Sequence, residues 1–494
     1  MRQFLAAALA AISLLPALPA FAQQAKTLRR ELDPAVVSGD VLKPLWGAKA
    51  DNLRLFAKRK GQFEVIPFQI DEKDPDGEFL INTNTIPEEV QKEVDLDDVP
   101  EADKRKKRIK KFEKNLEDYR EDVKDGKLTQ QALDDLRRNA YWDEKPGEFD
   151  YNDELVFMVR DSGARVARAE WGASQGVEIE ISDPVDGGKS WAYLLSFPSN
   201  PPPLNPLDYI AYYPKTDTVD GRMGEVDFMD DKPMIAESIV GKMPDGTRIP
   251  NVLDRFKLRI RILLTPLFCI PMNFDENNSK AFTIGYKDGP VRVIRRNVFW
   301  AVLKGIKVPF FPNIVMYFQF YENGLATEAK FRNPINLKWF VCGGSRFTAG
   351  LDLRKSAYGS QVFTRDNRGD SGMILDGRMS EAEKRLSVAN QFWIAGFLPN
   401  NAALMSRMRY DPELIRRGAI LDLYYLDDEA SNDGPENEPG QHIIGYTMDI
   451  RKFPAGTYHM GFQVYQAFDF KPGQEQELLN IDDKPLQVKA GSPE

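Results

Sequence analysis

The sequence is poor in the residues from which many catalytic and metal centres are built. It has two histidines, His442 and His459, and two cysteines, Cys269 and Cys342, among 494 residues. A CxxCH haem motif, a cysteine cluster for zinc and the local motifs of a Ser–His–Asp or Cys–His centre are therefore missing. If the chain turns near Pro454, the histidines lie about 26 Å apart at ~3.3 Å per residue, too far to share a metal ion. We expect both histidines to be structural.

Long apolar runs are missing after the first 22 residues. No later segment contains about 18 consecutive uncharged apolar residues, which argues against an integral helical membrane protein. Residues 1–22 have the pattern of a secretory signal peptide, with Arg2, an apolar stretch and a small–x–small site that ends at Ala22. We expect cleavage after Ala22 and a chain that is periplasmic or secreted from a bacterium. In that oxidising compartment the two cysteines could form one disulfide, and two buried thiols are the alternative.

The chain also lacks an excess of positive charge. Its formal net charge is −9 at pH 7, which disfavours nucleic acid as the main partner. The strongest basic run, KRKKRIKK at 104–111, could hold phosphate groups of the cell envelope or an acidic glycan. Because NLEDYREDVKD follows this run, a solvent-exposed helix with ion pairs is the alternative.

Strand-like segments, in which apolar and polar residues alternate, occupy most of the chain. This pattern predicts a mainly β fold with two or three β-sandwich-like domains and a charged α-helical hairpin insertion. The predicted parts are a signal peptide (1–22), an N-terminal β-domain (23–197), a Pro-rich linker (198–206), a central β-sandwich domain (207–430) and a C-terminal region (431–494). In the C-terminal region, HIIGYTMDI and TYHMGFQVYQAF are joined by RKFPAG, which predicts a β-hairpin that can pack on the central domain.

The insertion at 86–142 has a different pattern from the rest of the chain. Apolar residues step by three and four positions, which predicts one stripe on a helix; they are Ile109, Phe112, Leu116, Tyr119 and Val123. Thr129 can cap a second helix that carries Leu133 and Leu136. We expect the stripe to pack on this second helix.

Two acidic segments flank the insertion. The first contains Asp71, Asp74, Asp76 and Glu78, and the second contains Asp150 and Asp153. Since a hairpin returns to its starting point, both segments should meet at its base. A calcium ion takes six to eight oxygen ligands, more than either segment supplies alone. The sequence therefore predicts one split calcium site, and two polar turns are the alternative.

A resemblance supports the same region. PFQIDEKDPDGEF followed by DYNDELVFMVRDSG resembles a pattern in secreted bacterial proteins of uncharacterised function, in which Pro-x-Gln-x-Asp leads through an acidic loop to Asp-Glu-Leu-Val-Phe. Some of these proteins are associated with polysaccharide utilisation, and their folds are taken to be β-sandwiches. GPVRVIRRNVFW and YFQFYENGLATEAKF are similar to strand pairs in the β-supersandwich of mutarotases and polysaccharide lyases. The resemblance implies a glycan-related role and identifies no catalytic residue.

Apolar surfaces and aromatic residues give two further candidates. VPFFPNIVMYFQFY (308–321) is apolar on both faces, which predicts a buried central strand or an apolar surface for a protein partner or an envelope component. Several aromatic residues could form a sugar platform or a core; they are Trp171, Trp191, Tyr209, Tyr212, Tyr213, Trp300 and Trp393.

We expect an exported, non-catalytic binding or scaffold protein, with a glycan as candidate ligand and calcium as candidate stabiliser. A polysaccharide-active lyase or hydrolase on a β-supersandwich is the alternative. An enzyme of that kind should have a concave cleft lined by tyrosine, arginine, carboxylate and tryptophan together.

Overall fold

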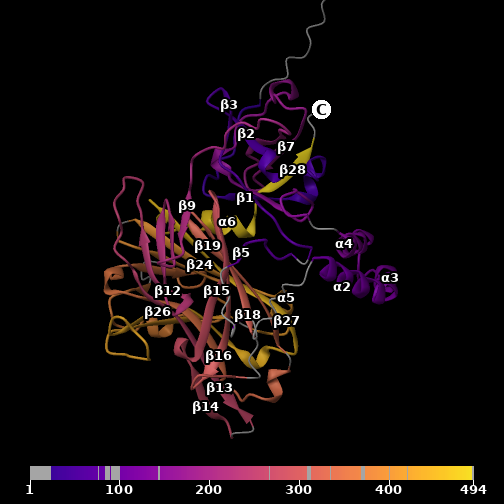
Figure 1. The fold of residues 1–494 in the computed structure, drawn as a ribbon. Helices are drawn as coiled ribbons and strands as arrows, with labels where there is room; N and C mark the ends of the chain where they lie inside the picture. Colours follow the sequence, from indigo (N-terminus) through magenta and orange to yellow (C-terminus); the bar gives the residue numbers. More distant parts are fainter. Residues whose placement is uncertain are drawn as a thin grey trace, which may run out of the picture.

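The computed structural model describes residues 24–75, 77–83, 90, 101–142, 145–265, 268–308, 313–333, 335–368, 373–399, 401–419 and 421–491. Within these residues the chain is mainly β and its sheets are antiparallel (Figure 1), as the strand-like sequence pattern predicts. The predicted signal peptide (1–22) lies outside the described residues. No helix among the described residues is long and apolar enough to cross a membrane.

Two small sheets form the N-terminal part of the molecule. The strands are β1 (Pro34–Ser38), β2 (Leu53–Arg59), β3 (Gln62–Val65), β4 (Gln69–Asp71), β6 (Glu154–Met158), β7 (Gln175–Ser182), β8 (Lys189–Ser196) and β28 (Gln487–Gly491). One sheet has the order β1-β6-β4 and the other β28-β7-β8-β2-β3. Leu53, Leu55 and Ala57 of β2 are fully buried in a core that both sheets share, because alternate side chains of each strand face inward.

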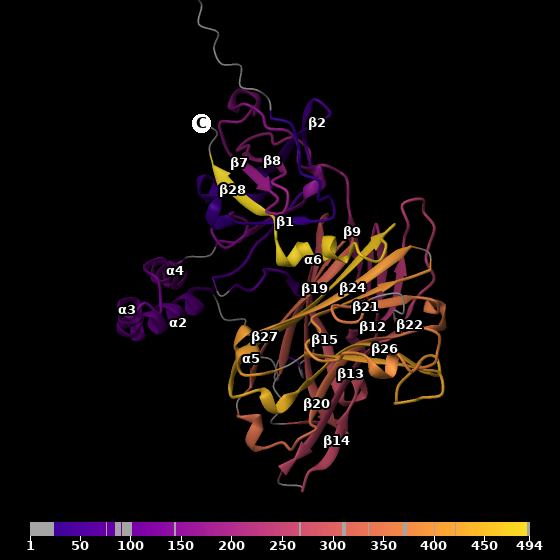
Figure 2. The ribbon, with the colours of Figure 1, turned by 180° about the vertical axis from the view of Figure 1, so that it is seen from behind.

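The last strand of the chain belongs to the first part of the molecule. β28 pairs with β7, after helix α6 (Glu475–Asp483) has brought the chain back. Figures 1 and 2 show this yellow C-terminal segment beside the indigo and magenta N-terminal strands. The segment 431–494, predicted as one region that can pack on the central domain, is therefore shared between the two parts.

An extended sheet dominates the rest of the molecule. Among the described residues it has 11 strands in the order β22-β21-β23-β24-β27-β19-β18-β16-β15-β5, with β17 paired to β16. The strands are β5 (Asn82–Thr83), β15 (Ser279–Asp288), β16 (Arg292–Leu303), β17 (Ile306–Lys307), β18 (Ile314–Tyr321), β19 (Gly324–Asn333), β21 (Gln361–Thr364), β22 (Met373–Ile374), β23 (Trp393–Phe397), β24 (Ala402–Tyr410) and β27 (Gly456–Phe468). β18, which contains most of the apolar run 308–321, lies centrally between β16 and β19.

Two further sheets pack against this extended sheet. One has the order β14-β13-β20-β26-β25 and the other β12-β11-β10-β9. Their strands are β9 (Ile210–Tyr213), β10 (Thr218–Gly221), β11 (Gly224–Met229), β12 (Lys232–Gly241), β13 (Leu253–Leu264), β14 (Ile270–Phe274), β20 (Arg346–Leu353), β25 (Leu421–Asp428) and β26 (Gln441–Asp449). Met408 of the extended sheet and Met448 of the β13 sheet lie in one buried cluster, so the two sheets form a sandwich. The linker 198–206 lies between the end of β8 and the start of β9.

The prediction of a C-terminal hairpin is wrong. β26 pairs with β20 and β25, whereas β27 pairs with β19 and β24. The two strands that RKFPAG connects therefore lie in opposite sheets of the sandwich. Tyr446 of β26 and Tyr458 of β27 are both buried in the core between these sheets, and this burial replaces pairing within a hairpin.

Three helices whose bounds the structure describes lie between β5 and β6, within the segment predicted as a helical hairpin. They are α2 (Glu101–Lys114), α3 (Leu116–Lys124) and α4 (Gln130–Tyr141), and they project to one side of the sheets (Figures 1 and 2). The apolar stripe is divided between α2 and α3, because the first helix ends at Lys114. Phe112 is buried and its ring contacts Tyr141 of α4 with the centroids 6.1 Å apart. Thr129 caps α4 by accepting a hydrogen bond from the Ala132 amide.

Candidate functional site

The two acidic segments lie side by side at the base of the helical insertion. Asp71 of β4 is the register partner of Glu154 of β6. The Lys73 amide donates to Asp153 Oδ1 over 3.1 Å, and Asn152 Nδ2 donates to the Lys73 carbonyl over 2.9 Å. Strand pairing and these hydrogen bonds therefore bring together carboxylates that are more than 70 positions apart in the sequence.

Lysine and arginine side chains neutralise Asp71 and Glu154. Asp71 is fully buried, with Arg292 Nε 2.6 Å from its Oδ2 and Lys287 Nζ 3.1 Å from its Oδ1. Glu154 forms ion pairs with Arg292 and Lys73. Burial alone would raise the pKa of both carboxyls, but Arg292 and the lysines overcome it and hold each pKa below its ordinary value. Both groups are therefore ionised at neutral pH.

Asp153 differs from Asp71 and Glu154, because its pKa is raised. It is fully buried, accepts hydrogen bonds from the amides of Lys73 and Asp150, and lies close to the carboxylate of Asp150. Burial and the charge of Asp150 raise the pKa of Asp153 to about 7. Asp150 is buried as well and accepts a hydrogen bond from Trp142 Nε1 over 3.1 Å.

The other predicted calcium ligands have different surroundings. Asp74 is buried and accepts the Glu78 amide over 3.0 Å, with Lys104 of α2 at 3.9 Å. Glu78 pairs with Arg296 of β16 over 2.9 Å and accepts a hydrogen bond from Tyr317. Asp76 lies outside the described residues. The described part of the chain contains no group of three or more His, Cys, Asp or Glu residues placed to hold a metal ion. The split calcium site stays a prediction.

The histidines lie in different sheets. His442 of β26 is buried, with Nδ1 2.6 Å from Asp427 Oδ1 and Nε2 3.1 Å from the Tyr358 hydroxyl. Asp427 also accepts the amides of Asp376 and Gly377, so it connects the β25 and β26 strands to a neighbouring loop. His459 of β27 is exposed, 3.6 Å from Glu328.

Most of the aromatic residues that could have formed a sugar platform are core residues. Six of the seven candidates are less than 9% exposed; they are Trp171, Trp191, Tyr209, Tyr212, Trp300 and Trp393. Of these candidates only Tyr213 is exposed, at 52%. A sugar ring needs an accessible aromatic face, and the six buried rings do not offer one.

An apolar cavity lies within the sandwich, and the sequence alone did not predict it. Its volume is about 290 Å³, and it lies between the β13 sheet and the extended sheet. The residues that line it belong to several strands; they include Phe256, Leu258, Ile260, Ile262 and Leu264 of β13, Phe347 and Ala349 of β20, Tyr446 and Met448 of β26, Met316 and Phe318 of β18, and Met460 and Phe462 of β27. Five alternate positions of β13 line the cavity, and they span about 26 Å at ~3.3 Å per residue.

The cavity wall carries almost no polarity. Among the described residues that line it there is no charged side chain, no histidine and no tryptophan. The Tyr446 hydroxyl already donates to the Ser406 carbonyl over 2.7 Å. Leu258, Ile260 and Ile262 are half-buried although they face the interior, in contrast to the fully buried β2 side chains. The opposite sheet is therefore not closely packed around these three side chains, and the space beside them suits an apolar ligand.

A sequence signal for this wall existed. FKLRIRILL places apolar residues at every second position of β13 and basic residues between them. On the face of β13 that points away from the cavity, Lys257 is buried and forms ion pairs with Asp352, Asp433 and Glu436. The alternation identifies the strand, but it does not show how far away the opposite sheet lies.

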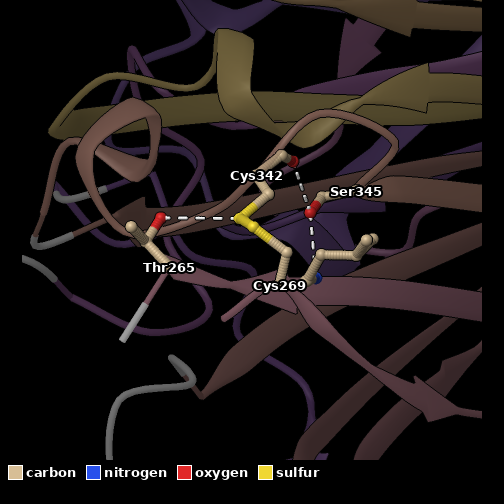
Figure 3. Close-up of a disulfide and its surroundings, with 5 residues drawn as sticks. Thr265, Cys269, Cys342 and Ser345 are labelled. Atoms are coloured by element: carbon tan, nitrogen blue, oxygen red, sulfur yellow. Dashed lines mark hydrogen bonds between the residues drawn. A yellow bond between two sulfur atoms is a disulfide. The ribbon is translucent and has the colours of Figure 1, made fainter. Parts of the chain in front are cut away.

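A disulfide closes one end of the β13 sheet. Cys269 and Cys342 are bonded, with their Cα atoms 5.8 Å apart, so the pairing left open by the sequence is present (Figure 3). Ser345 Oγ donates to the Cys342 carbonyl over 2.9 Å and accepts the Leu263 amide over 3.0 Å. The bond joins the β13–β14 turn to the loop before β20.

Comparison with known proteins gives distant structural similarity only. No family model and no curated protein matches the chain. An α-mannosidase from Enterococcus faecalis V583 has a TM-score of 0.35 at 10% identity, over 64% of this chain and 39% of that chain. A glycosyl hydrolase family 38 protein from Enterococcus faecalis has a TM-score of 0.40 at 8% identity, over 95% of this chain and 46% of that one. A putative aldose 1-epimerase from Escherichia coli K12 has a TM-score of 0.31 at 9% identity, over 52% of this chain and 99% of that chain.

TM-scores of this size do not define a shared fold. This chain also spans less than half the length of the two Enterococcus proteins.

Proposed function

We propose that this protein is an exported, non-catalytic binding protein that holds an extended apolar molecule, such as an acyl chain, between its two packed sheets. The observation that carries the proposal is the apolar cavity of about 290 Å³. Natural ligand pockets begin at about this size, and transfer of each CH₂ group from water contributes about 0.8 kcal/mol. A wall without charged groups favours an uncharged, flexible chain over a glycan, whose hydroxyls need hydrogen-bond partners.

The wall also distinguishes binding from catalysis. A polysaccharide lyase or hydrolase needs carboxylate, tyrosine, arginine or histidine groups that converge on the substrate. The described residues of the cavity wall include no carboxylate, arginine or histidine, and the hydroxyl of Tyr446, the tyrosine in the wall, already donates to the Ser406 carbonyl. Export rests on the N-terminal signal pattern and is part of the proposal.

Titration with N-phenyl-1-naphthylamine, a fluorescent apolar probe, followed by displacement with a long-chain fatty acid, tests the proposal. We expect saturable binding with one site per chain. The substitution Ala349→Phe places a ring in the cavity and should weaken probe binding about tenfold or more, because it removes apolar volume. Thr457→Phe, at an exposed position of β27, is the matched control.

These measurements distinguish apolar-ligand binding from glycan binding and from polysaccharide cleavage. Equal probe binding by Ala349→Phe and the control, with both proteins folded by near-UV circular dichroism, would reject the cavity as the site. Absence of probe binding together with saturable oligosaccharide binding would favour the glycan-binding alternative, and release of reducing ends would favour the enzyme. A rise in Tm with calcium over chelator, lost in Asp150→Asn, would support the calcium prediction.

A further inference from the structure

Six large apolar side chains are exposed at one end of the sandwich. They lie in the β13–β14 turn and the loop before β20 and at the strand ends next to the β13–β14 and β16–β17 turns, and we call them the apolar collar; they are Phe268, Ile270, Leu303, Ile306, Trp339 and Phe340. Phe268 is 93% exposed, Trp339 75% and Ile306 74%. Single exposed apolar residues are common, but several on neighbouring loops mark an interaction surface.

Covalent and hydrogen-bonded contacts hold the collar together. The Cys269–Cys342 disulfide joins the loops that carry Phe268 and Trp339, and the Thr265 amide donates to the Phe340 carbonyl over 3.0 Å. Phe274 of β14 packs in one cluster with Ala301 and Val308, on either side of the β16–β17 turn.

The backbone also keeps Phe268 exposed. Its φ is +53°, and that of Cys269 is +60°, a left-handed conformation that costs energy for residues other than glycine. The Phe268 amide donates to the Thr265 carbonyl over 3.2 Å, which closes this turn. Phe268 therefore combines an exposed side chain with a strained backbone, a combination that is typical of functional positions.

The charge around the collar is opposite to that of the whole chain. The segments 260–274, 301–308, 335–346 and 449–453 contain seven basic residues and one acidic residue; they are Arg261, Lys304, Lys307, Lys338, Arg346, Arg451 and Lys452, with Asp449. Register pairing places Arg261 beside Arg346 and Arg346 beside Asp449, so these segments are neighbours. The complete chain has a net charge of −9.

We infer that the apolar collar docks on an anionic lipid bilayer surface. Exposed aromatic and aliphatic side chains insert at the level of the lipid headgroups, and lysines beside them are attracted to anionic lipids. The positive charge around the collar selects this occupant over a neutral apolar partner. Leu264 and Phe340 also line the apolar cavity, so docking would place the end of the cavity at the bilayer. This last step rests on the proposed function, whereas docking itself needs no ligand in the cavity.

Flotation of the purified chain with vesicles tests the inference. We expect binding to phosphatidylcholine vesicles that contain 30% phosphatidylglycerol, little binding to pure phosphatidylcholine, and a blue shift of tryptophan fluorescence. The variant Phe268→Ser/Trp339→Ser should weaken binding about tenfold or more. Lys304→Glu/Lys338→Glu should weaken it to a similar extent and reduce its dependence on salt.

Matched controls change exposed residues elsewhere. Leu204→Ser/Tyr213→Ser removes exposed apolar groups far from the collar in sequence, and Lys110→Glu/Lys111→Glu reverses two exposed charges on α2. Neither control should alter vesicle binding. Ala349→Phe should also still bind, which separates this inference from the proposed ligand. Unchanged binding by both collar variants, binding lost through the α2 variant, or collar-dependent dimers without vesicle binding would each overturn the inference.

Discussion

At the scale of single residues, Asp153 shows how position in the fold changes chemistry that the sequence alone suggests. In the sequence it is one of several acidic residues at the base of the insertion. In the structure it is fully buried beside Asp150 and lacks the ion pairs that neutralise Asp71 and Glu154. Its raised pKa therefore makes this carboxyl group respond to pH near neutrality.

This residue should make stability depend on pH. Its folded pKa of about 7 exceeds the unfolded value, so the folded state binds more protons between about pH 4 and 7. The contribution of Asp153 to the free energy of unfolding should therefore fall as pH rises through this range, by at most roughly 4 kcal/mol. Urea unfolding of the wild type and Asp153→Asn at several pH values measures the difference.

The control for this prediction is Asp118→Asn on α3, where the carboxylate is exposed. Its difference from the wild type should stay constant over the same range. The free energy of unfolding of the wild type minus that of Asp153→Asn should fall between pH 4 and pH 7.5, and a difference that does not fall would contradict the raised pKa.

At the scale of elements, β13 and β14 illustrate how local pattern and tertiary packing combine. The alternation in FKLRIRILL specifies a strand with one apolar face. The disulfide then joins the β13–β14 turn to the loop before β20 across 73 positions of sequence. This crosslink holds two loops of the apolar collar in one arrangement.

Removal of the disulfide should lower the stability of this end of the sandwich. A closed loop of this length constrains the unfolded chain by roughly 4 kcal/mol in the chain-entropy view. Cys269→Ser/Cys342→Ser should therefore unfold at lower urea concentration and show faster amide exchange in β13 and β14. Dithiothreitol should reproduce the effect in the wild type and leave the variant unchanged; equal stability of both proteins would contradict this role.

At the scale of the whole molecule, a buried charge network links the N-terminal sheets to the extended sheet. Arg292 of β16 contacts Asp71 of β4 and Glu154 of β6, and the Gln69 side chain accepts the amides of Val291 and Arg292. Together with β28, which returns to the N-terminal sheet, these contacts make the two parts depend on each other.

Breaking this network should destabilise the complete chain. Asp71→Asn removes the charge of the fully buried carboxylate that pairs with the buried Arg292. Loss of one partner of a buried ion pair typically lowers the free energy of unfolding by about 3 kcal/mol. Chemical denaturation should show this loss of stability. The control Asp103→Asn, in an exposed ion pair with Lys106, should lower the free energy of unfolding by well under about 1 kcal/mol. Addition of Arg292→Met to Asp71→Asn should recover part of the loss. Equal effects of the buried and the exposed substitution would contradict the network.

The sequence by itself determined the features that depend on neighbouring residues. Alternation determined the mainly β class, as in β13, and the three-and-four spacing together with Thr129 indicated helices between Glu101 and Tyr141. The acidic segments on either side of those helices indicated that Asp71 and Asp153 belong to one region, because an insertion returns to its starting point.

Only the tertiary structure decided which strands pair, which charges are neutralised and where space remains. β26 and β27 are adjacent in sequence, yet burial of Tyr446 and Tyr458 between two sheets separates them. Arg292 neutralises Asp71 across more than 200 positions, which no local spacing encodes. The apolar cavity arises because the opposite sheet is not closely packed around three side chains of β13, and the distance between sheets is a property of packing.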